Sequence, residues 1–441
     1  MTALRLAWLL GKPTKERRGP LVLTAGAYLL VCALVLIVLS GALSFTRVQN
    51  DLTGAYRILA ALAVVLLIVP LTAVGMAAAR LSVRSQDTRL STVRLLGGTP
   101  GLVTAMTVVE STATALIGAV GGVALYALLA PLVGLVHFQG SAIGTAMWLP
   151  PATIGLVLLG VLVVAAGSSA VGLRRVMVSP LGVRNRVVTP KPRWIRAAVM
   201  VGLIAVIYAA FNALAVLQSL ALIVAVLLAG FALALGGINL VGPWAVALIA
   251  KRKLRGAQRP EHLLAARMIL ENPAQAWRQV SGLAMTSFVA VVGGSGAALM
   301  ATTAAEGPAE SPDALFATDI MTGVLVTLAV SFVSVACSTA ITQAAATLDR
   351  RTLYEGLERL GMQRKTLEKA RVGSVMGPVV GVGMGAAVIS AVLLFPLVGA
   401  AIVIAPVSVA IIVATLLTGL LTVRGSVALT KVDRMLKPIP H

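Results

Sequence analysis

Acidic and titratable side chains are scarce in this sequence. Its 441 residues include only 15 Asp and Glu, three His and two Cys, and charged residues make up 12% of the total. A soluble globular domain carries about 25% charged residues, so the composition excludes that class. His137, His262 and His441 lie far apart along the chain and share no spacing typical of a metal site or catalytic triad. We therefore expect neither a metal site nor enzymatic activity in this chain.

A nucleotide-binding loop is missing as well. A P-loop needs several Gly residues and a closing Gly-Lys-Ser/Thr to wrap a phosphate. The nearest match, Gly-Lys-Pro-Thr at 11–14, has no upstream Gly and no hydroxyl directly after Lys. We expect the chain to hold no cofactor of its own and not to hydrolyse ATP by this route. Cys32 and Cys337 fall inside apolar stretches, where we expect buried free thiols.

Apolar residues, in contrast, make up 59% of the sequence. A helix that crosses a bilayer needs roughly 20 apolar residues. The sequence therefore predicts an all-α polytopic membrane protein with about ten transmembrane helices. The apolar stretches cover 20–45, 54–79, 103–134, 151–172, 197–214, 218–250, 279–301, 315–345, 373–396 and 399–421. Only a weak turn separates the fifth and sixth stretches, so one long broken helix is the alternative there.

Lys and Arg gather in alternate loops between these stretches. The basic segments are 1–19, 80–102, 173–196, 251–278, 346–372 and 422–441, and they hold all 36 Lys and Arg except Arg47 and Arg57. Because basic loops stay on the cytoplasmic side of a membrane, this pattern predicts that both termini are cytoplasmic. The net charge of +21 then reflects topology. We expect the chain to lie in a lipid bilayer and to bind no nucleic acid, since its basic residues are spread over six loops.

The two halves of the sequence repeat one order of features. Pro13 and Arg18 precede the first apolar stretch, and Pro273 and Arg278 precede the seventh at the same offset. A charged segment follows the second stretch and another follows the eighth. We therefore predict two parallel four-helix repeats joined by a two-helix connector. The first repeat covers 1–172, the connector 173–259, and the second repeat with a cytoplasmic tail 260–441.

The two charged segments, 84–97 and 348–361, combine apolar residues at helical spacing with charged residues on the other side. We interpret each as a cytoplasmic lever helix that inserts into a partner protein. A solvated loop helix held by its positive charge is the alternative, but the recurrence in both halves favours the lever. The residues expected to carry the coupling are Arg84, Asp87, Leu90, Val93, Arg94, Leu96, Gly97, Leu353, Glu355, Leu357, Leu360 and Gly361.

Glycines recur at every fourth residue in two apolar stretches. They are Gly118 and Gly122 in the third stretch, and Gly373, Gly377, Gly381 and Gly385 in the ninth. This spacing leaves a groove in which another helix approaches closely. The groove serves either ordinary packing or a seam along which helices slide.

Glu110 lies about two turns into the third stretch. A carboxylate inside a membrane is costly unless it is paired or reaches water. Glu110 is therefore either a gate or an intramembrane ion pair, or an interfacial residue in front of a span that starts later. Its reachable cationic partners are Arg84, Arg89 and Arg94. We expect the other acidic residues near the spans, Glu306, Glu310 and Asp319, at the outer surface.

Several of these residues form a familiar pattern. The run Leu-Ser-Thr-Val-Arg-Leu-Leu-Gly-Gly-Thr-Pro at 90–100, followed by Glu110 and by three Gly in 118–122, resembles the domain of FtsX-like permeases. That family covers the membrane subunits of MacB- and LolC-type ATP-binding-cassette (ABC) transporters. The second-half run Glu-Arg-Leu-Gly-Met at 358–362 is similar but more divergent. Two such domains in one ten-span chain resemble the layout of Bce-type, bacitracin-exporter permeases.

The resemblance implies an ATP-driven complex in a bacterial plasma membrane. A separate ABC ATPase, in two copies per permease, would bind ATP and Mg²⁺ and dock on 84–97 and 348–361. The implied function is a permease subunit that couples this ATPase to export or extraction of an amphipathic compound, such as a drug, an antimicrobial peptide or a lipid. A mechanotransmitter that signals to a membrane histidine kinase or an outer enzyme is the alternative. A secondary transporter without an ATPase is a third hypothesis.

One feature departs from the Bce-type layout. Permeases of that type carry a large extracytoplasmic domain between the seventh and eighth spans. Here the corresponding segment is only 302–314. The resemblance therefore does not extend to peptide sensing through such a domain.

Overall fold

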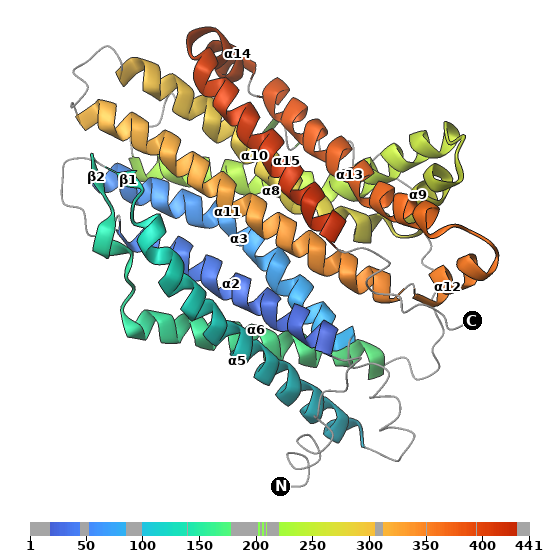
Figure 1. The fold of residues 1–441 in the computed structure, drawn as a ribbon. Coiled ribbons are helices and arrows are strands. Elements are labelled where there is room, and N and C mark those ends of the chain that lie inside the picture. Colours follow the sequence, from blue (N-terminus) through green and yellow to red (C-terminus); the bar gives the residue numbers. More distant parts are fainter. Residues whose placement is uncertain are drawn as a thin grey trace. The chain divides into compact units, whose positions relative to one another are not determined.

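The computed structural model describes residues 18–44, 53–84, 99–177 except 139, 220–304, 312–349 and 351–429 except 394, with a few isolated positions between 202 and 209. In these ranges the chain is built of helices with one short β-hairpin (Figure 1). The helices are α2 (Arg18–Ser44), α3 (Thr53–Arg84), α5 (Pro100–Val133), α6 (Pro151–Met177), α8 (Leu220–Arg255), α9 (Pro260–Glu271), α10 (Pro273–Ala304), α11 (Pro312–Asp349), α12 (Arg351–Arg359), α13 (Arg364–Leu393), α14 (Phe395–Ile404) and α15 (Pro406–Leu429), with the 3-10 helix η1 (Gly144–Met147). Strands β1 (His137–Phe138) and β2 (Ser141–Ala142) pair antiparallel.

Nine helices in the described part of the chain are long and apolar enough to cross a membrane. They confirm that the chain is an all-α, multi-pass membrane protein. In a bilayer the helix is the natural spanning element, because it pairs its own backbone polar groups. The predicted fifth stretch, 197–214, lies almost wholly outside the described residues, so the tenth helix stays a prediction.

The last apolar stretch differs from the sequence prediction of a helix over 399–421. α14 ends at Ile404 and α15 begins at Pro406, so the helix is interrupted at Ala405, although its N–H and carbonyl oxygen still bond to Ala401 and Val409. Proline has no N–H to donate, and its ring disfavours helical backbone at the residue before it. The candidate span of α15 is Pro406–Val427, and the predicted start at residue 399 lies within α14.

The chain forms two compact units. Unit 1 comprises 1–53, 68–185 and 337–349, and unit 2 comprises 54–67, 186–336 and 350–441. Helices α3 and α11 are therefore divided between the units. The units are defined by which segments pack together, whereas the predicted repeats are defined by order along the chain. The repeat boundaries stay a prediction.

Two glycines bring α5 against α2 in unit 1 (Figure 1). A Cβ added at Gly118 would meet the carbonyl oxygen of Ala25 and would lie 2.8 Å from the Cβ of Tyr28. A Cβ added at Gly122 would lie 2.6 Å from the carbonyl oxygen of Leu29. Between lipid-embedded helices such close backbone approach replaces the hydrophobic effect as the source of association. The contact therefore needs Gly at both positions.

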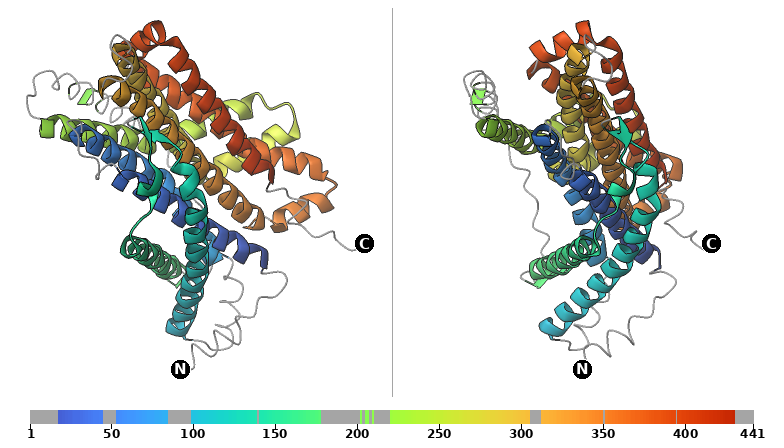
Figure 2. Two further views of the ribbon diagram at one scale, coloured as in Figure 1. Left: turned by 60° about the vertical axis from the view of Figure 1, so that its left-hand side comes forward. Right: turned by 90° about the vertical axis from the view of Figure 1, so that its left-hand side faces the viewer.

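The side chain of Tyr126 forms hydrogen bonds with the segment that follows α5. The Tyr126 hydroxyl donates to the Met147 carbonyl oxygen at 2.5 Å and accepts from the Leu149 N–H at 3.0 Å. The ring of Trp148 meets that of Tyr126 edge to face, with centroids 6.4 Å apart. Figure 2 shows the β-hairpin at this end of α5. The hydrogen bonds to the buried Tyr126 fix η1 before α6 begins.

In unit 2, helix α10 packs against α8, α13, α14 and α15. A Cβ added at Gly383 of α13 would lie 3.2 Å from a methyl carbon of Leu283 on α10. The indole N–H of Trp277 donates to the Asn239 side-chain oxygen on α8 at 2.7 Å, and the indole ring lies over Gly242. Small residues on the neighbouring helices thus receive the large side chains of α10.

Replacing Gly118 and Gly122 with Ala is expected to destabilise the chain, because each added Cβ meets α2 backbone or Cβ atoms. Overpacking of this kind costs about 1–3 kcal/mol per site. Thermal unfolding of the full-length protein in detergent measures the loss as a lower midpoint temperature. The matched control is Gly155→Ala with Gly160→Ala on α6, where nothing lies within 4 Å of the added Cβ. Equal midpoints for the two variants would contradict the close contact.

Candidate functional site: the hairpin of α12 and α13

The first predicted coupling segment lies mostly outside the described residues. Its members there are Asp87, Leu90, Val93, Arg94, Leu96 and Gly97. Arg84 is the last residue of α3. The role of this segment stays a prediction, and the site is built from its counterpart in the second half.

Helix α12 ends in a Schellman motif centred on Gly361. Gly361 has φ +89°, a left-handed conformation that Gly adopts without steric cost. Its N–H donates to the Glu358 carbonyl oxygen at 2.9 Å, and the Met362 N–H donates to the Leu357 carbonyl oxygen at 3.0 Å. These two bonds satisfy carbonyls at the helix end and turn the chain directly into α13.

The inner side of the hairpin has a small core of its own. Tyr354 is 2% exposed and packs with the buried Leu367 at the start of α13. Leu357 and Met362 join them, and Leu264 of α9 closes the cluster. Leu357 and Met362 stand at the two positions whose apolar side chains often accompany a Schellman motif. α12 is thereby held against α9 and α13.

The outer side of the hairpin leaves two leucines uncovered. Leu353 is 49% exposed and Leu360 is 84% exposed. Glu355 is half-buried, while Arg359 and Lys365 are exposed. The spacing of Leu353, Leu357 and Leu360 predicts one apolar side, but the structure divides them between an inner and an outer side. Tyr354, which is not among the predicted coupling residues, takes the most buried position of α12.

A salt bridge closes the turn between the helices. The Nε of Arg364 lies 2.6 Å from Oε1 of Glu358, and both side chains are partly exposed. A pair this accessible to solvent contributes little to stability, about 0–1 kcal/mol. Its geometric effect is to hold the C-terminal turn of α12 beside the first turn of α13.

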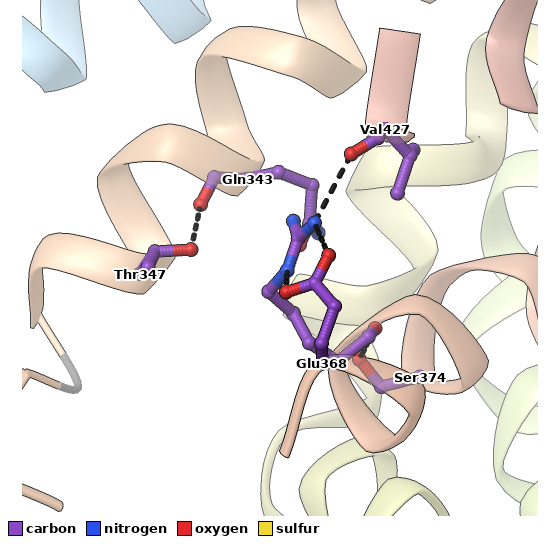
Figure 3. A network of polar contacts seen from close by, with 6 residues as sticks. Gln343, Thr347, Glu368, Ser374 and Val427 are labelled. Carbon is purple, nitrogen blue, oxygen red and sulfur yellow. Dashed lines mark hydrogen bonds and ion pairs between the residues drawn. The ribbon is translucent and has the colours of Figure 1, made fainter. Parts of the chain in front are cut away.

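Arg371 joins α13 to the end of α15 (Figure 3). Its side chain is 1% exposed, and its guanidinium binds Glu368 through Nε at 3.1 Å and through Nη2 at 2.6 Å. Nη2 also donates to the Val427 carbonyl oxygen at 3.1 Å. Val427 lies in the last turn of α15, where carbonyls have no partner within the helix and carry partial negative charge. The buried cation therefore caps α15 and is neutralised by Glu368.

The glycines of α13 face different neighbours. A Cβ added at Gly373 would lie 3.4 Å from Ala265 of α9, and one at Gly381 would lie 2.9 Å from Ile249 of α8. A Cβ at Gly377 would lie 2.8 Å from the Lys253 ammonium, and Gly385 faces open space. Gly383, outside the predicted stripe, makes the contact with α10. The stripe is thus mainly a surface for α8 and α9.

Glu110 lies in α5 within the candidate span Thr104–Val133, and its side chain is half-buried. Its carbonyl oxygen accepts a hydrogen bond from the Thr114 hydroxyl at 2.9 Å. The predicted cationic partners Arg89 and Arg94 lie outside the described residues. An ion pair of Glu110 with them stays a prediction.

Asp319 departs from the expectation that it lies at the outer surface. Its side chain is 5% exposed, and its Oδ2 accepts a hydrogen bond from the Tyr56 hydroxyl at 2.5 Å. The Phe316 ring meets the Tyr56 ring edge to face, with centroids 5.1 Å apart. A buried carboxyl needs such a donor. The sequence signal was weak, because Tyr56 and Asp319 are separated by most of the chain.

The described residues hold no group of three or more His, Cys, Asp and Glu side chains that is arranged to bind a metal ion. Comparisons with protein-family models, with curated proteins and with solved structures each found no match. The resemblance to FtsX-like permeases therefore stays a prediction, and function has to be argued from the geometry.

Replacing Arg371 with Met is expected to destabilise the chain by about 3 kcal/mol, since it leaves Glu368 and the end of α15 without their cation. Arg371→Lys should recover part of the loss, because an ammonium donates to one acceptor but lacks the planar fork. Thermal unfolding in detergent provides the measurement. Lys369→Met, an exposed change two residues away on the same helix, is the control. If Arg371→Met and Lys369→Met have the same unfolding midpoint, the capping role of Arg371 is wrong.

Replacing Tyr56 with Phe is expected to cost about 2 kcal/mol, because it removes a donor from a buried carboxyl. Asp319→Asn should cost less, since the amide oxygen still accepts from the Tyr56 hydroxyl. Unfolding of both single variants and the double variant gives the coupling between the two side chains. Additive losses would show that the hydrogen bond contributes nothing.

Proposed function

We propose that the chain is the permease subunit of an ABC transporter, in which a separate ATPase drives export or extraction of an amphipathic compound. The observation that carries the proposal is the hairpin of α12 and α13. Along the sequence, α12 comes after the candidate span of α11 and before that of α13, and it belongs to neither. It presents Leu353 and Leu360 on a support that is fixed by its own core.

A rigid, leucine-bearing helix suits insertion into a partner protein. Exposed apolar side chains ringed by charged residues are typical of interaction sites. Because the Schellman motif and the Tyr354 cluster already fix α12, docking loses little conformational entropy. Arg359 and Lys365 beside the leucines add positive charge, which favours an acidic groove on the partner.

The proposed architecture is duplicated, with repeats over 1–172 and 260–441 and a connector over 173–259. Packing within each unit supports it. In unit 1, α2 contacts α5 across Gly118 and Gly122, and in unit 2, α10 contacts α13 across Gly383. α2 and α10 are the first apolar helices of their repeats, and α5 and α13 are the third. The same two positions are therefore in contact in both halves.

Coupling in this proposal is mechanical. Two ATPases bind the segments 84–97 and 348–361. When the ATPases close on ATP and Mg²⁺, they move these segments. α13 runs without a break from the hairpin into its apolar span. Arg371 joins α13 to the end of α15, so a displacement of α12 reaches two spans. The chain supplies no nucleotide chemistry.

The proposed location is the plasma membrane of a bacterium, with ten spans and both termini in the cytoplasm. The segregation of Lys and Arg supports this orientation. Apolar side chains are exposed along α14 and α15, among them Val403, Val407 and Leu421. This surface favours a route for the transported compound at the lipid boundary over a hydrated pore.

Purification of the tagged full-length chain from its native membrane tests the proposal. An ATPase with a P-loop should co-purify, in two copies per permease, and Leu353→Asp with Leu360→Asp should lower its recovery by at least about tenfold, as for central apolar contacts of an interface. The control is Leu135→Asp, because Leu135 is also exposed but lies in the loop after α5, on the opposite side in the proposed topology.

Each outcome separates the three hypotheses. Loss of the ATPase with the hairpin variant only, together with ATP-dependent transport in vesicles, supports the permease. A histidine kinase that co-purifies while vesicles transport nothing supports the mechanotransmitter. If no ATPase associates and vesicles still transport, the chain is a secondary transporter and the proposal is wrong.

A further inference from the structure

Five basic side chains gather where α8 ends and α9 begins. We call them the basic collar: Lys251, Arg252, Lys253, Arg255 and Arg259. All five are exposed, and within the described part of the chain none of them forms an ion pair. The nearest acidic residue in the sequence is Glu261, in the first turn of α9. The collar is therefore a concentrated and uncompensated positive charge.

One residue of the collar, Lys253, packs against a glycine of the neighbouring helix α13. The side chain of Lys253 crosses α13 at Gly377, where an added Cβ would lie 2.8 Å from Nζ and 3.7 Å from Cε. Ile249, one turn earlier on α8, fits against Gly381 in the same way. α13 has no charged residue from 372 to 393. The ammonium of Lys253 thus lies against an apolar stretch of α13.

Apolar stripes run away from the collar along both helices. On α13, Val380, Met384 and Val388 are exposed and follow Gly377 at helical spacing. On α8, the exposed residues Leu233, Leu240 and Trp244 lead up to the collar. Trp side chains at this position are typical of the membrane interface. Cations at one end and apolar stripes along the length match a molecule with an anionic head and long tails.

We propose that the basic collar binds the phosphate headgroup of an anionic phospholipid, whose acyl chains lie along the exposed stripes of α8 and α13. Basic residues at the end of a span attract anionic lipids by simple electrostatics. Gly377 adds specificity, because it lets the Lys253 side chain pack directly against the apolar surface of α13. An acidic protein would use the cations but would leave the apolar stripes uncovered. This proposal does not depend on the ATPase, whose docking hairpin is α12.

Native mass spectrometry of the full-length protein in detergent tests the proposal. Dioleoyl phosphatidylglycerol should bind in preference to dioleoyl phosphatidylcholine, which has the same chains and no net charge. Arg252→Gln with Lys253→Gln should weaken phosphatidylglycerol binding by about 25-fold, about fivefold for each cation removed. Arg252→Lys with Lys253→Arg keeps the charge and should keep the binding.

The matched control removes two exposed cations elsewhere, by Arg359→Gln with Lys365→Gln, and should leave phosphatidylglycerol binding unchanged. Equal weakening by both pairs would show a general charge effect and overturn the site. Displacement of the lipid by a large excess of inorganic phosphate would show that the collar recognises phosphate without the chains, and it would overturn the proposal of a phospholipid site. Unchanged lipid binding with loss of a co-purifying ATPase would make the collar a protein-docking surface and the lipid proposal wrong.

Discussion

The long apolar helices of this chain have to pair their backbone polar groups internally, because hydrocarbon offers no hydrogen bond to replace one that is missing. Within a helix the chain does this itself, and Ser and Thr side chains such as Thr286 and Ser390 bond to carbonyls one turn back. Helix ends are where the requirement becomes demanding. In unit 2 the buried Arg371 answers it at the end of α15, where its guanidinium donates to the Val427 carbonyl oxygen.

Shape decides how the helices associate. Apolar side chains gain little from leaving lipid for one another, so close approach of backbones becomes the main source of contact. Gly118 and Gly122 give α2 access to α5, and Gly383 gives α10 access to α13. Polar pairs such as Tyr56 with Asp319 and Trp277 with Asn239 then fix which faces meet. Both devices use few residues, and each residue has a defined neighbour.

α13 connects the features on which function depends. Its first turn forms the hairpin with α12, its second turn carries Glu368 and Arg371, and its middle carries the glycines that seat Lys253 and Ile249. In the proposed transporter, an ATPase acts on one end of this helix while an anionic lipid occupies its side. The proposed docking site and the proposed lipid site therefore share one rigid element, although their residues and their partners are distinct.

Sequence alone located most of the apolar helices, because a bilayer fixes a minimum apolar length that composition reveals directly. It also placed Gly361 at the end of the charged segment 348–361. The tertiary structure alone decided which face of each helix packs. The spanning helices are apolar all round, so no periodicity marks their buried side. On the charged helix α12, the division of Leu353 and Leu357 between outer and inner sides depends on Tyr354, Leu264 and Leu367 from three helices. The burial of Asp319 and the role of Arg371 likewise required partners that lie far away in the sequence.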